Sequence, residues 1–269
     1  MAGFDFGDAR FDLSNTKDRS ILRFLLSQAL FGEATGVYCG RSIYAAQTLE
    51  AAHFYVRQAR QELNHLELFA DIFRKLELSP EPAHWVIKLL AAHNDYYPLK
   101  VLMEHALGEG MVLDIFRDVL LQTLPDEDPR VPSIKKKLRV ICREEEEHIA
   151  WGEKETRRLL IERPGLKRAF YGLMELELMV VPFAVKGIQK QAPDHPVLKR
   201  LDAFVDHVRE RVWAQGRDLG FAPAERPGRL QRGLAVTAGL ALLARSQVAR
   251  SRSSLDKRYL EELGFAERS

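Results

Sequence analysis

Two short segments of this sequence place a histidine three residues after a glutamate. They are Glu62-Leu63-Asn64-His65 and Glu145-Glu146-Glu147-His148. Residues three apart on an α-helix share one face, so each segment can direct a carboxylate and an imidazole toward the same point. These two ligand types together suit first-row transition metals. The two motifs therefore predict metal-ion chemistry inside a helical protein.

The same spacing occurs at two other places that do not fit this site. Glu50 and His53 form one such pair, but Glu50 lies about 18 Å from Glu62 along one helix, at about 1.5 Å per residue. Glu81 and His84 form the other, and they flank a proline at a predicted helix start, where side chains usually face solvent. We therefore exclude both pairs from the candidate site.

Two single glutamates lie opposite the motifs when the helices are paired as antiparallel hairpins. Glu33 and Glu62 are nearly equidistant from a predicted turn at residues 47–49. Glu109 and Glu145 are equidistant from the centre of a proline-flanked loop. Residues equidistant from a hairpin turn lie at the same height, so two paired hairpins bring six candidate ligands to one level. These are Glu33, Glu62, His65, Glu109, Glu145 and His148.

Each of these glutamates interrupts an apolar stripe of its helix. Ionised side chains on a core face are costly unless they are paired or bound to metal, and two divalent cations would cancel four carboxylate charges. Glu104 competes with Glu109 on the third long helix, and Glu109 is preferred because Glu104 lies on a more polar face. Within Glu144–Glu147, the spacing to His148 selects Glu145, and we expect the other three to form a solvated face.

Almost the whole chain has the periodicity of helices, and no sustained alternation predicts a strand. Long helices are expected at 18–46, 50–76, 99–123 and 131–161, with a shorter one at 83–93. Further helices are expected after residue 166, with breaks at Pro182, 192–196 and 221–228.

The order Glu, Glu-x-x-His, Glu, Glu-x-x-His resembles the ferritin-like di-iron carboxylate superfamily. The resemblance covers residues 18–161 and implies an all-α fold, a ferritin-like four-helix bundle with additional C-terminal helices. Residues 1–17 would be an N-terminal extension, and residues 162–269 a helical extension packed on the bundle. The resemblance implies two iron ions, or one manganese and one iron, on the six ligands, which would also carry the catalysis.

Differences from other members narrow the resemblance to small soluble oxygenases, such as aldehyde-deformylating oxygenase and the tRNA-modifying hydroxylase. Rubrerythrins add a cysteine-ligated iron, but this chain has only Cys39 and Cys142 and lacks a Cys-x-x-Cys motif. Ribonucleotide reductase small subunits usually carry a radical tyrosine where this chain has Phe69. The resemblance implies a non-haem di-iron monooxygenase or oxidase. Its partners would be O₂, a small apolar organic substrate and an external electron donor such as a ferredoxin or reductase.

Other interpretations stay open on the residues alone. The protein could be a ferroxidase that handles iron as its substrate, or a helical interaction module without metal. Small residues near the ligands could leave room for a substrate or could allow close helix packing; they are Ala34, Gly36, Gly40, Gly108 and Gly110. Four aromatic residues are candidates for lining a cavity: Tyr38, Tyr44, Phe69 and Phe116.

Composition sets the remaining expectations. The 269 residues are 46% hydrophobic with a net charge of +2, which does not favour a nucleic-acid partner. No apolar run is long enough to span a membrane, and two isolated cysteines fit a reduced, cytoplasmic protein. Residues 226–258 are basic and enclose the apolar run 234–244. This segment predicts either a peripheral membrane or acyl-carrier contact, or a helix packed on the bundle.

Overall fold

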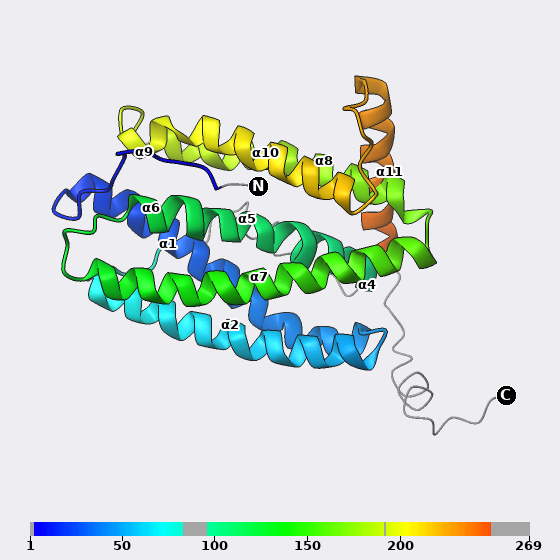
Figure 1. The fold of residues 1–269 in the computed structure, drawn as a ribbon, viewed down its shortest axis with the longest axis horizontal. Helices are drawn as coiled ribbons and strands as arrows, with labels where there is room; N and C mark the ends of the chain where they lie inside the picture. Colours follow the sequence, from blue (N-terminus) through cyan, green and yellow to red (C-terminus); the bar gives the residue numbers. More distant parts are fainter. Residues whose placement is uncertain (1–2, 83–95, 191, 249–269) are drawn as a thin grey trace.

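The computed structural model describes residues 3–82, 96–190 and 192–248, and it leaves the side chains of residues 38, 39, 183, 184, 247 and 248 undescribed. Every regular element within these ranges is helical, without a strand (Figure 1). The prediction of an all-α fold is therefore confirmed for this part of the chain. The helix predicted at 83–93 and His84 lie outside the described residues.

The first hairpin consists of α1 (Thr16–Gly36), a 3₁₀ stretch η1 (Val37–Ala45) and α2 (Leu49–Lys75). Side chains cap both α-helices: Asn15 accepts from the first amides of α1, and Thr48 accepts from Ala51 N at 3.1 Å. The helix predicted for 18–46 thus changes conformation at Val37. Gly36 and Gly40 both lower the α-helical propensity there, which lets the tighter conformation compete.

The third helical segment, residues 97–123, is continuous but not regular. It consists of α4 (Tyr97–Lys100), a π-helix η2 (Val101–Gly108), α5 (Glu109–Asp114), a second π-helix η3 (Ile115–Leu120) and α6 (Leu121–Thr123). Glu109 N donates to Glu104 O, five residues back, which is the π pattern. Since π turns are frequent at functional sites, the π turn directly before Glu109 indicates a functional site in this region.

The fourth long helix, α7 (Val131–Glu162), agrees with the prediction for 131–161 and has Pro132 in its first turn. It packs against α2 on one side and against η2 and α5 on another, while α1 packs on α2. The contact with η2 is close, because a Cβ at Gly152 would lie 2.6 Å from His105 Cβ. Four long helical segments thus surround one interior (Figure 1).

The C-terminal helices are α8 (Leu166–Gln189), α9 (Pro196–Lys199), α10 (Leu201–Asp218) and α11 (Arg229–Val248). Interruptions at 192–196 and 221–228 occur as predicted, but the break predicted at Pro182 is wrong, because α8 continues through that residue. Core contacts of Leu178 before Pro182, and of Val185 and Ile188 after it, offset the hydrogen bond that proline removes.

One hydrophobic cluster joins the C-terminal helices to the rest of the described chain. It includes Phe6 near the N-terminus, Leu102 of η2, Leu138 of α7, and Phe170 and Trp213 from α8 and α10. In Figure 1, α8 and α10 form a layer over the 97–123 segment, on the side away from α2.

The basic segment predicted from the sequence begins in α11, which packs against α8. Small residues form that contact: a Cβ at Gly239 would lie 2.9 Å from Leu173 N. Leu230 is 78% exposed on the outer side. Packing against α8 is therefore observed for α11, while packing on the four-helix bundle itself and a membrane or acyl-carrier contact both stay predictions. Among the described helices, none is long and apolar enough to cross a bilayer.

Candidate metal centre

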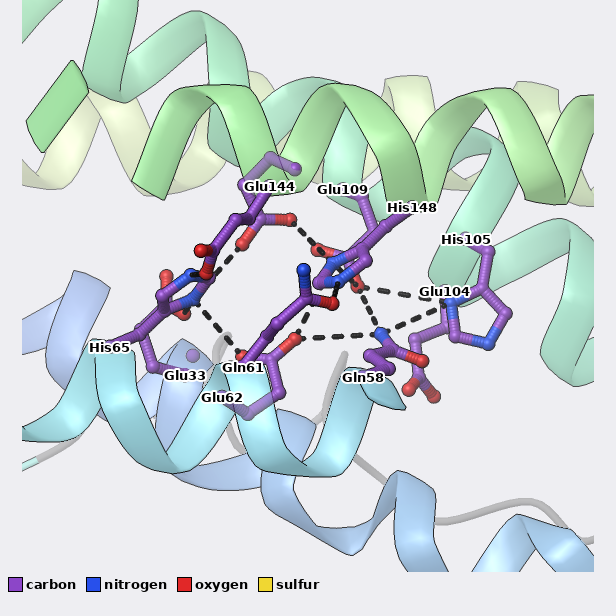
Figure 2. Close-up of polar contacts among 12 residues, drawn as sticks. Glu33, Gln58, Gln61, Glu62, His65, Glu104, His105, Glu109, Glu144 and His148 are labelled. Carbon is purple, nitrogen blue, oxygen red and sulfur yellow. Dashed lines mark hydrogen bonds and ion pairs between the residues drawn. The ribbon is translucent and has the colours of Figure 1, made fainter. Parts of the chain in front are cut away.

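Four helical segments deliver the six candidate ligands to one interior position. Glu33 comes from α1, Glu62 and His65 from α2, Glu109 from the start of α5, and His148 from α7 (Figure 2). Glu145 also comes from α7, one turn before His148. All are withdrawn from water: the most exposed, Glu109, shows 11% of its side chain. Such a concentration of buried acids requires compensation by protons or cations.

The six residues form two overlapping groups. One comprises Glu33, Glu62, His65 and Glu145, and the other comprises Glu62, Glu109, Glu145 and His148. Within each group, one ligand atom from every residue lies within 4.8 Å of the others. Glu62 and Glu145 belong to both groups, so their two oxygens could bridge a pair of ions. The structure thus brings together all the residues that were expected to converge, and their role as ligands stays a prediction.

His65 directs one ring nitrogen into the first group. Its Nδ1 lies 2.7 Å from Oε2 of Glu33 and 3.4 Å from Oε1 of Glu145. Its Nε2 lies on the other side of the ring, 2.8 Å from Oε2 of Glu144. Glu144 can therefore accept a hydrogen bond from Nε2–H and leave Nδ1 free as a ligand, an arrangement that increases the basicity of a metal-binding histidine.

His148 occupies the equivalent place in the second group with a different outer partner. Its Nδ1 is 3.3 Å from Oε2 of Glu145 and 3.6 Å from Oε1 of Glu62. Its Nε2 is 3.0 Å from Oε1 of Gln61, a neutral amide oxygen. The two histidines are therefore oriented alike, but only His65 has a carboxylate behind it.

This difference predicts unequal effects of two substitutions. Glu144→Gln should weaken the metal held by the first group about 10–100-fold, the range for loss of an outer-shell partner. Gln61→Glu should instead strengthen binding in the second group. Calorimetric titration with Co²⁺ measures both. Glu147→Gln, at an exposed position in the same run of glutamates, is the control; an equal loss in Glu144→Gln and Glu147→Gln would contradict the assignment.

Several polar residues of the site were missed from the sequence. The expectation that Glu144 faces solvent is wrong, since its side chain is only 16% exposed and contacts His65. Glu146 and Glu147 are exposed as expected. Gln61 adjoins Glu62, and neighbouring positions on a helix do not share a face, so helical spacing does not point to Gln61. Both missed partners reach across an interhelical contact, which a single helix does not specify.

A second missed pair lies beside Glu109. Nε2 of Gln58 donates to Oε1 of Glu109 at 3.0 Å and lies 3.4 Å from Nδ1 of the buried His105 (Figure 2). Helical spacing could have predicted both residues from the sequence, since Gln58 is four residues before Glu62 and His105 is four residues before Glu109. Burial lowers the pKa of His105 to about 3, so this ring is neutral.

The glutamates that were rejected as ligands have other partners in the structure. Glu104 pairs with Lys100, while Glu109 belongs to the second group, which agrees with the preference for Glu109. The exclusion of Glu50 agrees with its position, 64% exposed and paired with Lys154. Glu81, the other excluded acid, pairs with Arg23.

Of the aromatic candidates for a cavity wall, Phe69 and Phe116 are buried with ring centroids 5.6 Å apart. Tyr44 is 71% exposed, so that expectation is wrong. The side chains of Tyr38 and Cys39 lie outside the described residues. Cys142 is a buried free thiol whose pKa is raised to about 12, first by burial and then by the charges of nearby glutamates. It is therefore protonated and unreactive.

Protons take the place of cations in the metal-free site. Burial, with the charges of neighbouring carboxylates, raises the pKa of Glu33, Glu109 and Glu145 well above the usual range. Burial by itself lowers the pKa of His65, but hydrogen bonds to Glu33 and Glu62 and nearby charges outweigh it and raise that pKa to about 11. A divalent ion entering the site would displace these protons.

Two observations indicate that the residues fit metal ions. Oε1 of Glu145 is buried and makes no hydrogen bond among the described residues, although Nδ1 of His65 lies 3.4 Å away, so this oxygen would be available to a metal ion. Gly36 faces the Glu62 carboxylate, and a Cβ there would lie 2.5 Å from its Cδ. Glycine therefore provides the room that the carboxylate occupies. The oxygen and imidazole donors suit iron, manganese or cobalt.

The glycines near the ligands are used for close packing. A Cβ at Gly40 would meet Ala59 at 3.5 Å, one at Gly108 would meet Met103 O at 2.7 Å, and one at Gly110 would meet Arg211 at 3.0 Å. Of the two explanations left open by the sequence, these contacts support close helix packing at Gly36 and Gly110, whereas the neighbour of Gly108 belongs to its own helix, η2.

The contact at Gly36 leads to a stability prediction. Gly36→Ala should displace the Glu62 carboxylate and destabilise the protein by about 1–3 kcal/mol, as overpacking typically does. It should also weaken metal binding in both groups. Gly40→Ala is the matched control because its added methyl makes an ordinary contact with Ala59. Urea unfolding and Co²⁺ titration test the pair, and similar behaviour of the two variants would contradict the steric argument.

The described chain is thus an all-helical protein with a buried glutamate and histidine cluster able to hold metal ions. Comparison with protein-family models and with curated proteins finds no match. Any more specific function rests on the ligand geometry.

Proposed function

We propose that this protein is a ferritin-like four-helix-bundle protein that binds two iron ions. The observation that carries the proposal is the pair of overlapping four-residue groups sharing Glu62 and Glu145. Single glutamates come from two helical segments and Glu-x-x-His motifs from the other two, as in di-metal carboxylate bundles. Glu33 and His65 would complete one ion's ligands, and Glu109 and His148 the other's. Manganese in one position is a variant of the same site.

The proposed activity is that of a di-iron oxygenase or oxidase acting on a small apolar organic substrate. When bound, the ferrous pair would supply O₂ binding and electrons, replenished by an external donor such as a ferredoxin or reductase. The four carboxylates balance the charge of two divalent ions without further anions. Glu144 and Gln61 orient the two imidazoles. The additional helices α8 and α10 count against the simpler subunit of an iron-storage cage.

Aromatic side chains would keep water from one end of the centre. Phe54 and Trp151 stack with ring centroids 3.7 Å apart, and Phe54 meets the His148 ring edge-on at 5.9 Å. Neutral His105 and the Gln58 amide lie between this stack and Glu109. Uncharged groups thus cover part of the end near Glu109, and a lower local dielectric there strengthens the interaction of its carboxylate with a cation.

Anaerobic Fe²⁺ loading followed by O₂ tests the proposal. We expect two ions per chain and a transient absorbance band in stopped-flow mixing that is lost in His148→Ala and retained in His53→Ala, an exposed histidine of α2. Loading below one ion per chain would contradict the di-iron centre. A multi-subunit shell that accumulates iron, measured by native mass, would instead indicate a ferroxidase.

A further inference from the structure

The helix α10 contacts the helical segments that carry Glu109 and His148. Gln215 of α10 is buried, and its Nε2 donates to Ala106 O in η2 at 2.7 Å and to Glu153 Oε1 in α7 at 2.8 Å. Ala106 precedes Glu109 by three residues, and Glu153 follows His148 by five. One amide group therefore connects the two helical segments that supply Glu109 and His148 to the second group.

Arg211 reinforces this connection on the other side of Glu109. Its Nε donates to Oδ2 of the buried Asp114 at 2.6 Å, and its Nη1 donates to Oε1 of Gln215 at 3.3 Å. Arg211 and Gln215 are four residues apart and so share one face of α10. Gly110 permits this approach, because a Cβ there would lie 3.0 Å from the guanidinium. The chain is thus held both before and after Glu109.

The irregular conformation of residues 97–123 makes such support necessary. The π turns of η2 end at Gly108, directly before Glu109, so a shift in this turn moves the carboxylate. The two residues that belong only to the first group, Glu33 and His65, are held by other helices, α1 and α2. An effect transmitted from α10 should therefore reach Glu109 and His148 before it reaches Glu33 and His65.

We infer that Gln215, assisted by Arg211, is a positioning residue for the half of the metal centre formed by Glu109 and His148. The inference rests on the proposed metal centre and assigns a role to the C-terminal helices within it. These helices would then be part of the site's framework, and their integrity would control the second ion selectively.

Co²⁺ titration of the full chain, followed by visible absorbance, tests this role. In Gln215→Leu, the first equivalent should bind as in the wild type, while the second should weaken about 10–100-fold, as for loss of an outer-shell contact. Gln189→Leu is the matched control, since Gln189 Nε2 also donates to a backbone carbonyl, Leu198 O, at 3.1 Å. That control should retain both equivalents.

A milder variant guards against loss of folding. Glu153→Ala removes only the α7 side of the connection at a half-buried position, so it should weaken the second equivalent less than Gln215→Leu does. Two results would overturn the role of Gln215 and leave the metal centre unaffected: unchanged binding of the second equivalent in both variants, or equal weakening of the two equivalents. A wild-type chain that binds no Co²⁺ would overturn the metal centre as well.

Discussion

Glu62→Gln is expected to weaken the binding of both metal ions strongly. Glu62 belongs to both ligand groups, and an amide supplies neither the negative charge nor two equivalent oxygens. The affinity for each ion should fall about 100-fold or more, the upper end of the range for outer-shell changes. Elemental analysis after Fe²⁺ loading and calorimetry with Co²⁺ measure this loss.

Three further substitutions make that result specific. Glu33→Gln and Glu109→Gln should each remove one ion, because each residue belongs to one group only. Glu50→Gln on the same helix as Glu62 should retain both ions, since Glu50 is exposed and pairs with Lys154. If Glu62→Gln keeps one ion at wild-type affinity, the bridging role is wrong even where the other ligands are right.

The second large expected effect is that the free energy of unfolding of the metal-free protein decreases as the pH rises. In the metal-free protein, the pKa values of Glu33, Glu109 and Glu145 lie above the usual 4.5, so the folded chain binds more protons than the unfolded chain. The stability from this source is fully present below pH 4.5 and is lost as pH rises through the folded-state values. His65 acts in the same direction between pH 6.5 and about 11.

Metal binding should reverse this trend. Ions displace the protons, so their affinity rises with pH, and each site at 100-fold excess over its dissociation constant adds about 2.7 kcal/mol. The difference in unfolding free energy between Co²⁺-loaded and chelated protein should therefore widen from pH 5 to pH 8. Urea unfolding at four pH values measures it. Surface carboxylates contribute equally to the loaded and the chelated protein, so they cancel in this difference. Glu62→Gln should show almost no difference between the two. A difference that stays constant with pH in the wild type would contradict the displacement of protons by metal.

The error at Tyr44 shows where sequence periodicity stops being informative. A 3₁₀ helix advances by about 120° per residue and an α-helix by about 100°. Over the seven residues from Val37 to Tyr44, the difference accumulates to about 140°, enough to turn an expected core position toward solvent. The apolar stripe of α1 therefore does not continue into η1, although the residues themselves suggest that it does.

By itself, the sequence determined the approximate bounds of the long helical segments and the identity of the six residues that converge, but not the 3₁₀ stretch η1, the π turns or the continuity of α8 through Pro182. Spacing of three on a helix and equal distance from a turn are local relations, and they hold in any antiparallel hairpin. The tertiary structure decided what surrounds those residues: Glu144 behind His65, Gln61 behind His148, and Gln215 reaching η2 from α10. These contacts join helices whose relative rotation and distance depend on the packing of the whole core, which no single helical period contains.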